Sequence, residues 1–283
     1  MKAEEIEFVK FLNDNRTNKL LIPIYQRAYE WTTGKEVSQL WEDINNIELN
    51  KDISTHFLNS IVYIKDESIK DSINIIDGQQ RITTISLLFI AIRDSLKNLQ
   101  KDSKKLSLSE NDLADIKIEI EKISENFLER KWQKFENRIR LSLSNKNNDF
   151  NIYKNLLFRD ILNKTRVDDI SKNKFIDKHN VFLKGKKSNL ISTYDYFQSK
   201  PLLKNYSFLE LKELLEKLEK VMIVQVTLEL GKDSPQIIFS SLNGGGLKLK
   251  DTDLIKNSLF MKVEDRAKQE ELHTELLENI KSA

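Results

Sequence analysis

The sequence predicts an α+β protein in which a few strands accompany a large helical region. Three observations lead to this class. Short apolar runs rich in β-branched residues predict strands, apolar residues at spacings of three and four predict amphipathic helices, and residues 100–220 show mainly helical periodicity. The chain has 283 residues, of which 39% are apolar and 32% charged. It is therefore long enough to bury a sizeable core, as one large domain or two ordinary ones.

The first hundred residues contain most of the predicted strands. A helix is expected at about 3–13, and residues 20–25 are expected to be extended because Pro23 disfavours a helical residue before it. Apolar residues spaced along 35–47 indicate an amphipathic helix. Two strands and a long helix, joined through Asp77-Gly78, are predicted next, at 57–64, 72–76 and 80–99.

The rest of the chain alternates between helices and loops until one more strand. Helices are predicted at 110–128, 148–164 and 207–220. Residues 221–230 form an apolar, β-branched run and predict a buried strand. A short helix at 236–242, a triple-glycine loop, a helix opening at Asp251 and a final helix to Ala283 are expected beyond it. Because neither Gly nor Pro ends that last helix, we expect 263–283 to be the start of a truncated C-terminal helix.

Composition excludes several kinds of protein. Lys and Arg number 46 against 44 Asp and Glu, so any nucleic-acid surface must be local; the middle third, 97–220, is basic with a net charge of +8. Cysteine is absent, which fits a cytoplasmic location, and no apolar run suits a membrane span or signal peptide. The three histidines are far apart, and neither a P-loop nor a dinucleotide fingerprint occurs.

The first candidate site is the turn between the second strand and the long helix. Gly78 permits a left-handed backbone, and the free N–H groups of the first helical turn can bind an anion. Arg81 offers a planar fork to phosphate, and Asp77 could cap the helix or bind hydrated Mg²⁺. Neutral polar groups are supplied by Gln79, Gln80, Thr83 and Thr84. The structural alternative is an ordinary helix N-cap with exposed polar side chains.

The second candidate site is the segment 23–31. Polar Gln26 and Arg27 interrupt a run of proline, isoleucine and aromatic residues that includes Tyr25. Aromatic faces can stack on a base while an arginine binds phosphate. The structural alternative is a strand-to-helix corner in which the aromatic side chains pack in the core and Arg27 forms an ion pair.

Two further segments are candidates. In 239–257, Asn243 and the glycines up to Gly246 allow close approach to a ligand, with Asp251, Asp253 and Lys256 on the helix that follows; a flexible connecting loop is the alternative. The stretch 130–140 carries five cations that could contact a DNA backbone, although such runs are usually solvated helix faces. These cations are Arg130, Lys131, Lys134, Arg138 and Arg140.

Together the segments PIYQRAYEW, IIDGQQRITTI and FSSLNGGGLKLKDTDLIKN resemble the signatures of the GmrSD-type restriction endonuclease N-terminal domain family, over about residues 6–262. The resemblance implies a small mixed sheet of the ParB/sulfiredoxin type beside a large helical region. It places a ParB-like nucleotide-binding domain at 1–97, completed by about 221–262, with a mostly helical basic region at 98–220.

The resemblance also implies binding and hydrolysis of a nucleoside triphosphate (NTP) with Mg²⁺, coupled to restriction of modified DNA in defence against phage. Asp77, Gly78, Gln79, Gln80 and Arg81 match the nucleotide-hydrolysing motif, in which Gln79 or Gln80 would orient water. Tyr25, Gln26 and Arg27 would line the same cleft.

The third signature falls on Asn243, Gly246, Asp253 and Lys256, which would close that cleft. Longer members carry an HNH nuclease domain whose histidines this sequence lacks, so a further domain or partner subunit would cut DNA. The competing hypothesis is a non-catalytic DNA- or protein-binding module with a vestigial ParB-like cleft.

Overall fold

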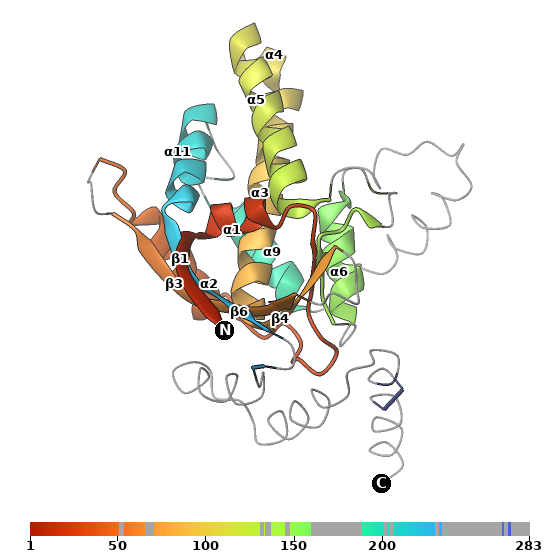
Figure 1. Ribbon diagram of the computed structural model, residues 1–283. Helices are drawn as coiled ribbons and strands as arrows, with labels where there is room; N and C mark the ends of the chain where they lie inside the picture. The colour runs from red at the N-terminus through yellow and green to blue at the C-terminus, as the bar shows by residue number, and fades with distance from the viewer. Residues whose placement is uncertain are drawn as a thin grey trace.

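The computed structural model describes most of the first 160 residues and parts of the remainder. The described residues are 1–50, 54–65, 71–130, 133, 137–144, 148–159, 188–200, 203, 207–229, 232–233, 268 and 271–272. Within them, six strands form one mixed sheet in the order β1-β6-β3-β4-β2-β5 (Figure 1). Pairs β1–β6 and β3–β4 are antiparallel, whereas β6–β3, β4–β2 and β2–β5 are parallel. The protein is therefore of the α+β class, as predicted.

The elements follow one another in two groups along the chain. The first group comprises β1 (Lys2–Glu7), α1 (Phe8–Asp14), β2 (Lys19–Leu21), α2 (Glu36–Asn45), β3 (His56–Lys65), β4 (Ser72–Asp77) and α3 (Gln79–Lys101). The second comprises α4 (Ser103–Leu106), α5 (Glu110–Ile123), the π-helix η1 (Ser124–Leu128), β5 (Leu141–Ser142), α6 (Asp149–Leu157), α9 (Asn189–Ser199), α11 (Phe208–Glu219) and β6 (Val221–Leu228).

Within the described residues most predicted elements are confirmed, and the main error lies at the N-terminus. The short helix expected at 236–242, the triple-glycine loop, the helix from Asp251 and nearly all of the final helix lie outside the described residues. The helix expected at 3–13 is wrong in its first half, where residues 2–7 form the edge strand β1. This strand pairs with β6 from Lys2–Thr227 to Glu7–Met222. Only Ile6 of β1 is buried, so the segment carries almost no apolar pattern of its own. Its conformation is decided by the ladder that a strand more than 200 residues away supplies.

Helix α3 is the centre of the molecule. One apolar core joins the sheet to α1, α2, α3, α5, α6, α9 and α11. The apolar residues of α3 are buried, among them Ile82, Leu88 and Ile92 at 0% exposure. α3 rises from the sheet, and both α5 and α9 pack against it (Figure 1).

The middle of the chain contributes directly to this core. Strand β5 extends the sheet beside β2, and α6 and α9 pack against each other. Asp149 of α6 and Thr193 of α9 both form hydrogen bonds to Tyr29, which is more than 100 residues away in sequence. No helix among the described residues is long and apolar enough to cross a membrane.

Candidate functional site

The turn between β4 and α3 requires glycine. Gly78 has φ 95° and ψ 5°, a left-handed conformation that most residues adopt only with strain. A Cβ added there would lie 3.0 Å from Ile61 Cγ1 and 3.3 Å from the Ser60 carbonyl oxygen. β3 is irregular at this point, since its register to β4 shifts between Val62 and Tyr63. Gly78 therefore lets the start of α3 approach β3 closely.

Asp77 and Arg81 form an ion pair across this turn. Arg81 Nη2 donates to Asp77 Oδ2 at 2.7 Å, and the two side chains are 16% and 21% exposed, respectively. Among the described residues the guanidinium donates to Asp77 alone, and its Nε is buried without a partner. The N-cap of α3 is Gly78, and no side chain caps the helix. The expectation that Asp77 might cap α3 is thus wrong, and the first-turn N–H groups have no side-chain acceptor at the cap.

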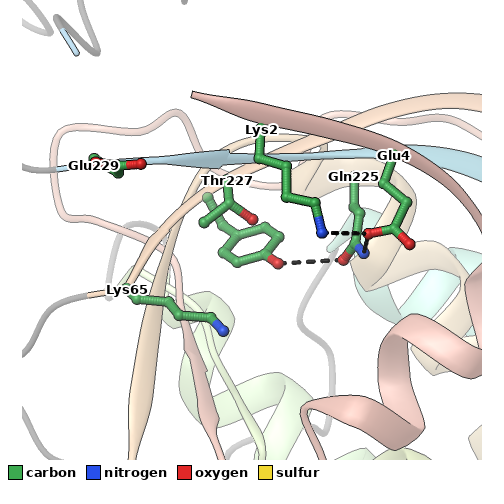
Figure 2. A pocket seen from close by; sticks show the side chains of 7 residues that line it. Lys2, Glu4, Lys65, Gln225, Thr227 and Glu229 are labelled. Atoms are coloured by element: carbon green, nitrogen blue, oxygen red, sulfur yellow. Dashed lines mark hydrogen bonds and ion pairs between the residues drawn. The ribbon is translucent and has the colours of Figure 1, made fainter. Parts of the chain in front are cut away.

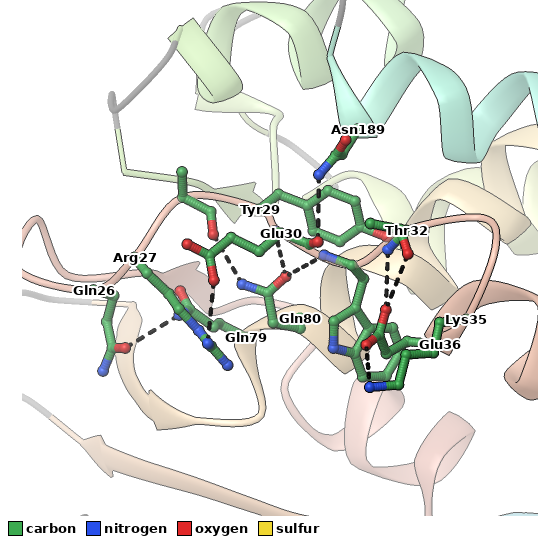
Figure 3. A network of polar contacts seen from close by, with 12 residues as sticks. Gln26, Arg27, Tyr29, Glu30, Thr32, Lys35, Glu36, Gln79, Gln80 and Asn189 are labelled. Carbon is green, nitrogen blue, oxygen red and sulfur yellow. Dashed lines mark hydrogen bonds and ion pairs between the residues drawn. The ribbon is translucent and has the colours of Figure 1, made fainter. Parts of the chain in front are cut away.

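The second sequence motif lies against the same turn. Gln26 Nε2 donates to the Ile76 carbonyl at 2.8 Å, and Gln79 Nε2 donates to Gln26 Oε1 at 3.2 Å (Figure 3). Tyr25 and Gln26 are buried, whereas Arg27 is partly exposed and pairs with Glu30 at 3.1 Å. Two segments some 50 residues apart therefore meet, each carrying one arginine paired with one carboxylate.

Gln80 holds the backbone of the segment that carries Arg27. Its Oε1 accepts from the Glu30 N–H at 2.9 Å and the Trp31 N–H at 3.4 Å, and its Nε2 donates to the Ala28 carbonyl at 3.0 Å (Figure 3). Both ends of the amide are engaged and the residue is only 6% exposed. This geometry assigns Gln80 to holding the loop and leaves Gln79 as the candidate for orienting water.

Thr83 and Thr84 lie one turn further into the helix, away from the turn itself. Their hydroxyls donate to the carbonyls of Gln79 and Gln80 at 2.7 and 2.8 Å, and both residues are almost fully buried. Thr84 Oγ1 also contacts the Tyr29 hydroxyl at 2.8 Å. The expectation that the two threonines bind a ligand is corrected accordingly: they tie α3 to its own carbonyls and to the loop.

Burial keeps the two tyrosines of this segment neutral. It raises the pKa of Tyr25 above the ordinary value and raises that of Tyr29 to about 12. Hydrogen bonds from Thr193 and Thr84 act in the opposite direction on Tyr29, but desolvation is the larger effect. Both phenols are therefore protonated at neutral pH.

The basic stretch that was expected to contact DNA is partly interior. Arg140 is 1% exposed, and its guanidinium donates to the carbonyls of Leu12 and Asn126, near the ends of α1 and η1. Arg130 is 8% exposed and donates to the carbonyls of Asn137 and Asp71. Neither side chain can reach a DNA backbone, which corrects that expectation for both.

The remaining candidates divide into one exposed residue and several outside the described part of the chain. Arg138 is exposed and donates from Nε to the Gln133 carbonyl at 3.3 Å. The expected site residues that lie outside the described residues are Lys131, Lys134, Asn243, Gly246, Asp253 and Lys256. Arg138 is therefore exposed enough for a DNA contact, and the role of the third motif stays a prediction.

Sequence reasoning missed the side chains that hold the second motif from the far side. The Tyr29 N–H donates to Asp149 Oδ2 at 2.8 Å, and Asn189 Nδ2 donates to the Glu30 carbonyl at 3.3 Å (Figure 3). The pairs are 120 and 159 residues apart in sequence. No local pattern marks either residue, since each is the first residue of an ordinary helix.

A separate hollow of about 300 Å³ lies on the sheet (Figure 2). It is lined by Lys2, Glu4, Tyr63, Lys65, Gln225, Thr227 and Glu229. Its polar groups largely satisfy one another: Lys2 and Gln225 donate to Glu4 at 3.2 and 3.3 Å, and Tyr63 donates to Gln225 at 3.2 Å. None of the residues predicted from the motifs lines this hollow, so we do not assign the site to it.

The described residues contain no group of three or more His, Asp or Glu side chains placed to hold a metal ion. Asp77 offers a single, partly exposed carboxylate at the turn. A Mg²⁺ ion that arrives with a nucleotide takes most of its ligands from phosphate and water and needs only one or two protein carboxylates. Asp77 fits that limited role, and the described residues could not hold the ion by themselves.

The chain matches the family described as GmrSD restriction endonuclease, N-terminal domain, over residues 8–260. This match covers most of the chain and includes the β4–α3 turn and the segment 23–31, so the chain belongs to this family. No curated protein sequence matches it.

Proposed function

With membership of this restriction endonuclease family as the premise, we propose that the β4–α3 turn binds and hydrolyses an NTP, within a system that targets modified DNA. The observation that carries the proposal is the contact between the two motifs. The Gln26–Gln79 hydrogen bond brings the segment carrying Arg27 against the turn carrying Asp77 and Arg81. Two cations and the uncapped start of a helix thereby lie around one glycine turn, which suits a polyphosphate.

The two ion pairs at the turn are exchangeable. Glu30 is 49% exposed, and exposed pairs contribute about 1 kcal/mol or less to stability, so a phosphate group can compete for Arg27 at small cost. Arg81 and Asp77 are more buried but remain partly open to solvent, so a phosphate group can take the place of the carboxylate there. The Arg81 Nε, buried without a partner among the described residues, gives the guanidinium a further donor.

In the proposed mechanism each residue of the turn has a separate role in hydrolysis. First-turn N–H groups and Arg81 bind phosphate oxygens, and Arg81 offsets the charge that develops on the transferred phosphoryl group. Gln79, held by Gln26, orients the attacking water. Mg²⁺, when bound, neutralises phosphate charge, and Asp77 would be its protein ligand. Asn243, Gly246, Asp253 and Lys256 belong to the family's third signature, and we propose that they close the site. Cleavage of DNA would need an HNH domain or partner subunit.

The experiment that tests this proposal measures phosphate release from each of the four NTPs with Mg²⁺, with and without modified DNA. Arg81→Ala should lower turnover about 100-fold or more, because it removes a donor used in the transition state. The matched control is Arg138→Ala, an exposed arginine outside the turn, which should leave basal turnover unchanged. Wild-type turnover that Arg81→Ala does not alter would place the chemistry elsewhere.

One observation favours a second candidate, a non-catalytic DNA- or protein-binding module. The 2.7 Å contact between Arg81 and Asp77 holds the guanidinium on a carboxylate, as a purely structural pair would. This candidate requires that no NTP releases phosphate. For a DNA-binding module, it also requires that DNA affinity fall steeply with salt concentration through exposed cations such as Arg138. The same phosphate-release panel, followed by a salt titration of DNA binding, separates the two.

A further inference from the structure

The loop that carries Arg27 lies within the segment 23–31. It is held by residues of α6 and α9 as well as by α3. Asp149 Oδ2 accepts from the Tyr29 N–H at 2.8 Å, and Asn189 Nδ2 donates to the Glu30 carbonyl at 3.3 Å. These are the first residues of α6 and α9, so two helix starts meet one short loop. Thr193, one turn into α9, contacts the Tyr29 hydroxyl at 3.3 Å.

The contacts from α6 and α9, together with those from α3, reach residues 28–31 of the loop. α3 holds it through Gln80, which binds the backbone of three loop residues, and through Thr84, which contacts the Tyr29 hydroxyl at 2.8 Å. We call the five residues that hold the loop the loop clamp: Gln80, Thr84, Asp149, Asn189 and Thr193. Three helices thus fix the loop within two residues of Arg27.

Asp149 is the buried carboxylate of the loop clamp, in the first turn of α6. The residue is 5% exposed, and the pKa of its carboxyl is raised by burial, with the Tyr29 N–H acting in the opposite direction. A buried carboxylate opposes folding unless its hydrogen bonds offset the lost hydration. No other hydrogen bond to its side chain is formed within the described residues, so its clear effect is to orient the Tyr29 backbone.

We propose that Asp149 is a positioning residue for the nucleotide site: it sets the loop so that Arg27 faces the β4–α3 turn. The effect of Asp149 on nucleotide binding rests on the proposed function. Its effect on the position of the loop rests on the hydrogen bonds alone. The loop itself is the element that connects Asp149 to Arg27, since Asp149 holds Tyr29 two residues away.

The test compares Asp149→Ala with Asp149→Asn and uses Trp31, within the loop, as the reporter. In protein labelled with 5-fluorotryptophan, the Trp31 fluorine resonance, assigned through Trp31→Phe, should shift or broaden in Asp149→Ala. It should stay at the wild-type position in Asp149→Asn, whose amide oxygen still accepts the Tyr29 N–H. Asp112→Ala removes an aspartate from the first turn of α5, far from the loop, and should leave Trp31 unchanged.

The same variants are then titrated with each Mg-NTP by calorimetry. Asp149→Ala should raise the dissociation constant about tenfold through misplacement of Arg27, and Asp149→Asn should restore it. If wild-type protein binds no NTP, the proposed function fails while the Trp31 resonance still decides whether the clamp exists. An unchanged Trp31 resonance in folded Asp149→Ala, or equal damage from Asp149→Asn, would overturn the inference. Should Asp149→Ala not fold, Asn189→Ala, at an exposed position, is measured in its place.

Discussion

Arg81 and Arg140 are both arginines that sequence patterns single out, and the structure uses them in opposite ways. Arg81 lies at the β4–α3 turn, partly exposed, on a single carboxylate. Arg140 is buried, and among the described residues it donates to two backbone carbonyls, those of Leu12 in α1 and Asn126 in η1. In the proposed function the first exchanges its partner for a phosphate, whereas the second supplies hydrogen bonds that the last carbonyls of two helices lack. The role of each arginine therefore depends on the hydrogen-bond acceptors that surround it.

The largest expected effect is on Arg140. Arg140→Ala leaves the carbonyls of Leu12 and Asn126 buried without donors and opens a cavity, so the free energy of unfolding should fall by about 3 to 5 kcal/mol. Urea denaturation measures this change. A loss below about 1 kcal/mol would mean that Arg140 behaves like a surface cation and that the contrast with Arg81 is false.

The next effect concerns the interior side of the turn. The pKa of Tyr29 is about 12 in the folded protein and near 10 when unfolded, so the unfolded state loses its proton first. Ionisation of Tyr29 therefore leaves the free energy of unfolding unchanged below pH 10. As pH rises from 10 to 12, the free energy of unfolding falls by about 2 to 3 kcal/mol in all. Stability measured across this range should fall less steeply in Tyr29→Phe than in wild type. Identical slopes would show that Tyr29 is not desolvated.

Gly78 tests how tightly the turn is packed. Gly78→Ala places a Cβ 3.0 Å from Ile61 Cγ1 in a left-handed backbone, which should cost about 1 to 3 kcal/mol. Thermal denaturation gives the cost, and NTP titration of the folded variant shows whether the first-turn N–H groups have moved. A variant as stable as wild type would show that the turn has room to relax.

The smallest effect returns to Arg81 and completes the comparison. Because its ion pair is partly exposed, Arg81→Ala should change the free energy of unfolding by about 1 kcal/mol or less, in contrast to Arg140→Ala. Arg138→Ala, at an exposed residue, should change it by about 0.5 kcal/mol or less. Urea denaturation of both variants beside Arg140→Ala gives the ranking. A destabilisation by Arg81→Ala that equals the Arg140 value would assign Arg81 to the fold.

Local patterns were sufficient for the elements with their own periodicity. The strands β3, β4 and β6 and the helices α2, α3, α5 and α11 lie close to their predicted ranges. The left-handed glycine between β4 and α3 was also predictable, because an apolar strand met an amphipathic helix through Asp-Gly. Strand β1 was not, since its conformation depends on pairing with β6.

The candidate site shows the same division. The residues at the glycine turn could be predicted locally, because strand, turn and helix are contiguous in the chain. The contact between Gln26 and Gln79, the hold of Gln80 and Asp149 on the loop and the burial of Arg140 follow instead from how distant elements pack. Hydrogen bonds between residues 50 to 120 apart depend on how the helices pack. That packing cannot be predicted from residues that are adjacent in the sequence.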